Sequence, residues 1–93
     1  MSGAKFSPGS LYATPGALEA FRVSGDDILA YLVKHLALDP GDLSPEDIAE
    51  NELSVREGFR ILSAYRLSDG KTKIWLITEA DRSSTTVLLP EEY

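Results

Sequence analysis

The sequence predicts an α+β fold in which three N-terminal helices pack on a C-terminal three-stranded antiparallel β-meander. Three observations point to this class. Apolar residues recur at helical spacing up to Gly58 and at alternate positions from Phe59 onward. Asp69-Gly70 is a strong signal for a short hairpin turn between two strands. A chain of 93 residues has room for a single core, so we expect one domain over residues 14–93.

The N-terminal half predicts a loose arm and two helices. Residues 1–13 carry glycine, proline and small polar side chains, which predicts a flexible arm. A short helix is expected at about 15–23, because Thr14 can cap it and proline suits its first position. A second helix is expected at about 26–38, where Ser24 and Asp27 can form an approximate capping box. Its apolar residues fill most of the circumference, so we expect it to be the most buried helix.

The third helix has the clearest boundaries. Ser44 can cap it, Pro45 suits its first position, and Gly58 suits its left-handed C-terminal end, which predicts a helix at about 45–57. Carboxylates in the first turn complement the helix dipole. The apolar residues of this helix form one narrow stripe for packing, namely Ile48, Ala49, Leu53 and Val55. We expect the remaining face to be solvated and negative.

The strands are expected at 59–67, 73–78 and 85–89, and Pro90 ends the last one because proline cannot donate to the ladder. The hairpin register is open between two forms. A two-residue turn pairs Ser68 with Lys71, whereas a three-residue turn pairs Ser68 with Thr72. The second form sets Tyr65 opposite Trp75 and is favoured for that aromatic pair.

The net charge of −6 is confined to one segment. The two flanking regions are neutral, whereas residues 39–57 set seven carboxylates against Arg56: Asp39, Asp42, Glu46, Asp47, Glu50, Glu52 and Glu57. A negative face repels a phosphate backbone, so we expect no direct nucleic-acid binding and favour a basic protein partner. The candidate binding residues are Asp42, Glu46, Glu50 and Glu57. The alternative is that these carboxylates only keep the helix soluble.

The stretch EADRSS at 79–84 is a second candidate binding site. Its plain interpretation is the polar link that joins two strands. Its functional interpretation uses Glu79, Asp81, Arg82 and Ser83, because Arg82 is a fork donor for carboxylate or phosphate and Asp81 can bind backbone amides. No base stands next to the serines, so we assign no catalytic residue.

His35 is the only imidazole, and we expect it to be structural and half-exposed near the end of its helix, one turn from Asp39. Asp39, Asp42 and Glu46 could hold a hard cation weakly, but their spacing fits no EF-hand. We therefore predict no metal and no cofactor.

The chain has no cysteine, no signal peptide and no apolar run of about 20 residues. These features predict a cytoplasmic protein that does not enter a membrane. A monomer and a homodimer both remain open.

Three stretches resemble a family of small bacterial proteins found on plasmids and integrated elements, some labelled plasmid-related and some labelled type I restriction subunits. They are TPGALEAF, the segment at 41–67 and the segment at 73–93, where ITEADRS and LLPEEY are the specific strings. The chain departs from this family at 38–43, where members carry a tryptophan, and in its hairpin at 69–72. The resemblance implies an accessory protein of a mobile element. A methyltransferase is excluded because 93 residues hold no cofactor-binding sheet.

Three classes of function remain open on the sequence. The first is a non-enzymatic protein-binding accessory that blocks a host restriction or CRISPR complex, with the acidic helix imitating a run of phosphates. The second is a small toxin-like ribonuclease, suggested by Arg60, Arg66, Lys73 and Arg82 on and beside the strands. The third is a subunit or sensing module of unknown ligand. We expect the first.

Overall fold

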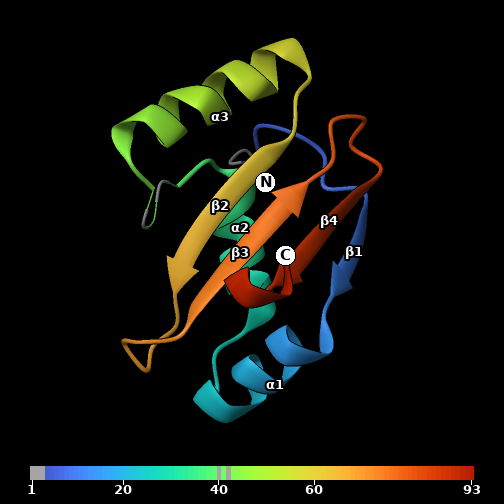
Figure 1. Ribbon diagram of the computed structural model, residues 1–93. Coiled ribbons are helices and arrows are strands. Elements are labelled where there is room, and N and C mark those ends of the chain that lie inside the picture. The colour runs from blue at the N-terminus through green and yellow to red at the C-terminus, as the bar shows by residue number, and fades with distance from the viewer. Residues whose placement is uncertain (1–3, 40, 42) are drawn as a thin grey trace.

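The computed structural model describes residues 4–39, 41 and 43–93 (Figure 1). Their elements, in chain order, are β1 (Ser10–Ala13), α1 (Pro15–Ser24), α2 (Ile28–Leu36), α3 (Pro45–Glu57), β2 (Ile61–Arg66), β3 (Lys73–Thr78), β4 (Ser84–Leu88) and the 3-10 turn η1 (Pro90–Glu92). The class is α+β, with helices before most of the strands.

The sheet has four strands in the order β1-β4-β3-β2, so the predicted three-stranded antiparallel meander was wrong. Residues 10–13, which we expected to belong to a flexible arm, form β1 and pair parallel to β4, from Ser10 opposite Ser84 to Ala13 opposite Val87. Gly9 makes this close approach possible. Its φ is +66°, and an added Cβ would lie 2.4 Å from the Arg82 carbonyl oxygen and from the Ser83 carbonyl.

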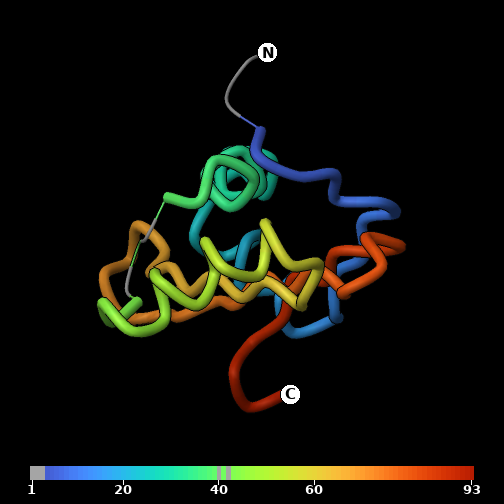
Figure 2. The backbone as a smooth tube through the Cα atoms, turned by 90° about the horizontal axis from the view of Figure 1, so that it is seen from above, coloured from blue at the N-terminus to red at the C-terminus, as the bar shows by residue number. Residues whose placement is uncertain are grey.

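The two faces of the sheet are covered differently. Figures 1 and 2 show α2 on one side of the sheet and η1 with the C-terminus on the other. The core lies on the helical side, where residues from α1 and the strands form one buried cluster: Ala17, Phe21, Tyr65, Leu67, Ile74, Leu76 and Val87. Burial raises the pKa of Tyr65 to about 12, and its hydroxyl donates to the Asp39 carbonyl oxygen at 2.8 Å.

Most of the predicted helix ends are confirmed. Thr14 caps α1 by accepting from the Ala17 amide, Ser44 caps α3 by accepting from the Asp47 amide, and Gly58 ends α3 with a φ of 81°. The start of α2 differs from the prediction. Its cap is Asp27, which accepts from the Leu29 amide, and not Ser24, because α1 extends through Ser24.

The prediction that α2 is the most buried helix was wrong. Only His35 of this helix is fully buried, whereas Leu29 is 57% and Val33 is 60% exposed. α2 packs on the sheet through one face, and its apolar outer face stays in contact with solvent. An apolar circumference therefore did not indicate burial on all sides.

The hairpin between β2 and β3 takes the register that we did not favour. Tyr65 lies opposite Ile74, and Ala64 lies opposite Trp75. Tyr65 and Trp75 therefore occupy opposite faces of the sheet and form no pair. Asp69 fixes this turn by accepting from the Lys71 amide at 2.9 Å and the Thr72 amide at 2.8 Å. Hydrogen bonds from Thr72 lower the pKa of Asp69 to about 2.

α3 is held against the outer edge of β2 by one polar side chain. Asn51 accepts from the Leu62 amide at 3.1 Å and donates to the Leu62 carbonyl oxygen at 2.5 Å. It thus supplies the two hydrogen bonds that a neighbouring strand would supply. The buried residues of α3 are Asn51 and Ser54, whereas Ala49 of the predicted packing stripe is exposed. Ile48, Leu53 and Val55 of that stripe are half-buried, so the predicted stripe packs only in part, and the fully buried positions of α3 are polar.

Candidate functional site

The outward face of α3 combines carboxylates with apolar side chains. At 3.6 residues per turn, Glu46, Glu50 and Glu57 lie within about 40° of one another around the helix axis, and all three are exposed. The exposed Ala49 and the half-buried Leu53 lie in the same sector. The predicted acidic residues among those described therefore share one face, while Asp42 lies outside the described residues.

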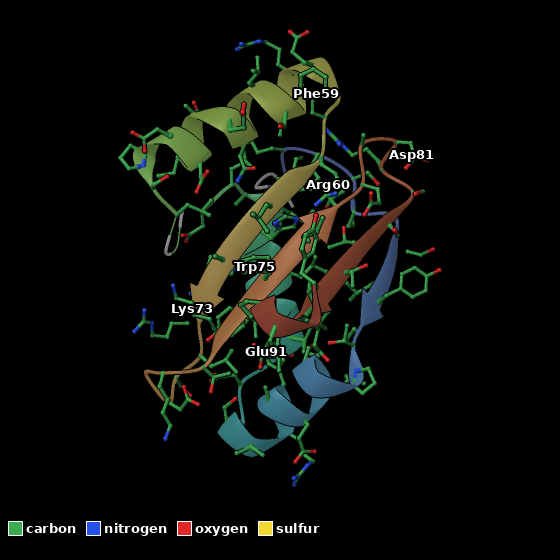
Figure 3. The ribbon with its side chains drawn as sticks, in the orientation of Figure 1. Phe59, Arg60, Lys73, Trp75, Asp81 and Glu91 are labelled. Carbon is green, nitrogen blue, oxygen red and sulfur yellow. The ribbon has the colours of Figure 1, made fainter. Side chains whose placement is uncertain are left out.

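This face continues into an exposed aromatic ring. Phe59 follows the C-terminal end of α3 and is 54% exposed, although strand alternation predicted it on the buried side. Figure 3 shows Phe59 and Asp81 at the same end of the molecule. We call the set Glu46, Ala49, Glu50, Leu53, Glu57 and Phe59 the α3 surface.

The EADRSS loop is fastened to this end of the molecule by Arg82. One guanidinium nitrogen donates to the carbonyl oxygens of Phe59 at 2.7 Å, Ala80 at 3.1 Å and Glu79 at 3.2 Å. The other donates to the Ser54 carbonyl oxygen at 3.0 Å. Ser54 lies in the last turn of α3, where the helix dipole favours a cation, and its carbonyl oxygen also accepts from the Gly58 and Phe59 amides. The two predicted binding segments are thereby joined, with Arg82 as the structural link between them.

Asp81 and Glu79, the other charged residues of the loop, lie in different environments. Asp81 is exposed and accepts from the Ser83 amide at 2.9 Å, and hydrogen bonds from Ser83 lower the pKa of this carboxyl. Glu79 points to the other face of the sheet, where it lines a hollow. Of the four, Asp81 is therefore the charged side chain that a partner of the α3 surface can reach from the loop.

Arg82→Gln is expected to lower the free energy of unfolding by about 2 kcal/mol, because charge-assisted bonds to carbonyl oxygens are lost. Arg82 also has a φ of 61°, a backbone conformation that Gln has to adopt as well, so the comparison reports the side chain. Arg82→Lys keeps the charge but cannot reach carbonyl oxygens on both sides, and we expect it to recover less than half of the loss. Urea denaturation of the three proteins measures this. Equal stability of all three would show that the link is not needed.

A buried hydrogen-bonded chain runs from β2 to the N-terminal segment. His35 Nδ1 lies 2.6 Å from Ser63 Oγ, and His35 Nε2 lies 2.8 Å from Thr78 Oγ1. Thr78 Oγ1 lies 2.6 Å from Thr85 Oγ1, which donates to the Pro8 carbonyl oxygen at 2.8 Å. The four side chains are at most 1% exposed. We call this set the polar chain.

The Pro8 carbonyl oxygen at the end of the polar chain determines which group donates and which accepts in each hydrogen bond of the chain. A carbonyl oxygen only accepts, so the Thr85 hydroxyl proton is used on Pro8, and Thr78 must donate to Thr85. His35 Nε2 must then carry a proton and donate to Thr78, which leaves Nδ1 of a neutral ring to accept from Ser63. Burial lowers the pKa of His35 to about 4, in agreement with a neutral ring. The predicted half-exposed histidine beside Asp39 was therefore wrong.

The face of the sheet opposite α2 carries an open hollow of about 180 Å³. It is lined by Arg60, Ile77, Glu79, Thr86, Leu88 and Tyr93. Arg60 donates to the Tyr93 hydroxyl at 2.6 Å, and the Tyr93 ring packs edge-on against Trp75 at 5.7 Å. Figure 3 shows Arg60, Lys73 and Trp75 on this face. Arg60 and Glu79 are the charged side chains that line this hollow, whereas His35 is buried on the other side of the sheet, out of reach of the ribonuclease alternative.

Comparison of the chain with protein-family models, curated proteins and solved structures gave no match. Within the described part of the chain, no group of three or more acidic or histidine side chains is arranged to hold a metal ion. Over the same residues, no helix combines the length and the apolar character that crossing a bilayer needs.

Proposed function

We propose that this protein is a non-enzymatic accessory protein that binds a basic surface of a partner protein through the α3 surface. The observation that carries the proposal is the exposed Phe59 at the end of a row of exposed carboxylates. Exposed aromatic rings are frequent anchors of protein interfaces, and surrounding charges guide the encounter. Ala49 and Leu53 within the acidic face favour a protein partner.

The resemblance to proteins of plasmids and integrated elements supports a partner in a host defence complex, of the restriction or CRISPR kind. Such complexes hold nucleic acid in basic channels, which an acidic helix of this length can occupy. The non-enzymatic part of the proposal is supported by the burial of His35 and by the use of Arg82 as a structural link.

Two charge-matched double variants test the proposal. Glu46→Gln with Glu50→Gln removes two charges from α3, and Glu19→Gln with Glu91→Gln removes two exposed charges elsewhere, so both take the net charge from −6 to −4. We expect partner capture from the native host to weaken by about tenfold in the α3 variant and to lose much of its salt dependence. The control variant should bind like the wild type.

Equal weakening in both variants would mean that net charge, and not the α3 surface, matters. Unchanged capture, together with cleavage of single-stranded RNA that Glu79→Gln abolishes, would put the ribonuclease alternative in place of this proposal.

A further inference from the structure

The two edges of the sheet differ in whether their outward backbone groups have hydrogen-bond partners. At the β2 edge, Asn51 binds both backbone groups of Leu62. At the other edge, β1 has β4 on one side only, and no helix or strand of the described residues lies beyond it in Figure 1. Natural sheets protect such edges with very short strands, charges, prolines or bulges, because unpaired backbone groups recruit another strand. β1 is short, with four residues, but none of them is charged or a proline.

The direction of the backbone groups along β1 follows from two hydrogen bonds to β4. The Ser10 amide donates to the Ser83 carbonyl oxygen and the Thr14 amide to the Val87 carbonyl oxygen, both at 3.0 Å. Backbone groups alternate in direction along a strand, so Tyr12 also faces β4. Leu11 and Ala13 therefore point their amides and carbonyls away from the sheet.

We propose that β1 pairs antiparallel with β1 of a second copy of this chain, about a two-fold axis at Tyr12. In this register Leu11 lies opposite Ala13 of the second copy, and each such pair of outward-facing residues exchanges two hydrogen bonds. Tyr12 lies opposite its own symmetry mate. It is 58% exposed and sits on the face opposite the core, so the two rings are free to meet.

A second copy of β1 fits this edge because, in this register, strand residues of one copy lie opposite strand residues of the other. A two-fold axis at Leu11 would require the second hydrogen-bonded pair to use Gly9, whose φ of 66° is outside the strand region. The axis at Tyr12 uses strand residues alone. A four-residue edge covers less area than the roughly 1,200–2,000 Å² of stable interfaces, so the dimer is weak and depends on concentration.

Single-cysteine cross-linking tests the register, because the natural chain has no cysteine. Directly opposed Tyr12→Cys residues fall within the Cα separation that a disulfide accepts, whereas Leu11→Cys residues are offset along the strands and lie beyond about 7 Å. We expect Tyr12→Cys to form the covalent dimer about tenfold faster than Leu11→Cys under mild oxidation. Both sites are exposed, at 58% and 40%, so thiol access does not explain a difference.

Sedimentation equilibrium provides the second measurement. The wild type is expected to dimerise reversibly with rising concentration, and Tyr12→Lys is expected to raise the dissociation constant about tenfold, since like charges then oppose each other. Equal cross-linking rates for the two cysteine variants, or a wild type that stays monomeric at high concentration, would overturn the proposal. In the second case an extended segment of another protein remains the occupant to test. The α3 surface takes no part in this contact, so neither outcome bears on the proposed function.

Discussion

Replacement of His35 by alanine is expected to lower the free energy of unfolding by about 4 kcal/mol. The imidazole is 0% exposed and holds both Ser63 and Thr78, so its loss leaves buried hydroxyls without their partner and a cavity between α2 and the sheet. His35→Gln, which can both donate and accept, should recover part of the loss. Urea denaturation followed by circular dichroism gives the three values.

Leu29→Ala is the matched control for this experiment, because Leu29 lies on the same helix and is 57% exposed. It should cost less than about 1 kcal/mol. A His35→Ala protein as stable as the Leu29→Ala protein would contradict the burial and the pairing of the imidazole. Loss of binding in His35→Gln with full stability would instead indicate a direct functional role for this residue.

The second large effect is a loss of stability in mild acid. The pKa of His35 is about 4 in the folded protein and 6.5 in the unfolded chain. Between these values the unfolded chain binds more protons, so the free energy of unfolding falls as pH falls through this window. The separation of the two pKa values corresponds to about 3 kcal/mol of stability, most of which is lost by pH 4.

The histidine effect separates from the carboxylates because His35 is the only histidine. Hydrogen-bonded carboxyls such as those of Asp69, Asp81 and Glu92 have lowered pKa values, so their stabilising contribution is lost as the pH falls through their ordinary values of 3.8 for aspartate and 4.5 for glutamate. Denaturation curves at several pH values between 7 and 5.5 should slope in the wild type and be close to flat in His35→Gln. A wild type without a slope would show that the ring remains accessible to protons.

Local signals were sufficient for the helices and for three of the four strands. Caps at Thr14 and Ser44 and the glycine at Gly58 act within a few residues, so the boundaries of α1 and α3 were predictable. β1 was not predictable, because four residues show little alternation and their partner strand is distant in the sequence. Ser10 pairs with Ser84, which lies 74 residues further along the chain. Gly9 was the available signal, since a glycine permits close backbone contact.

The polar chain also left a signal that sequence reasoning missed. Ser63, Thr78 and Thr85 alternate with apolar residues on the buried face of their strands, so three hydroxyls had to find partners in the core. His35 lies 28 residues from Ser63 and 43 from Thr78, and no local pattern joins them. The acidic character of α3 was predictable from composition, whereas the exposure of Phe59 depends on how α3 and the loop at Arg82 dock.

Site-specific photo-cross-linking from position 59 tests the proposed binding surface most directly. A benzophenone-bearing amino acid in place of Phe59 should give one discrete cross-linked partner in the native host, and the Glu46→Gln, Glu50→Gln background should remove it. The same photoreactive residue in place of the exposed Leu29 on α2 should not give that product. A partner captured from position 29 and not from position 59 would contradict the assignment of function to the α3 surface.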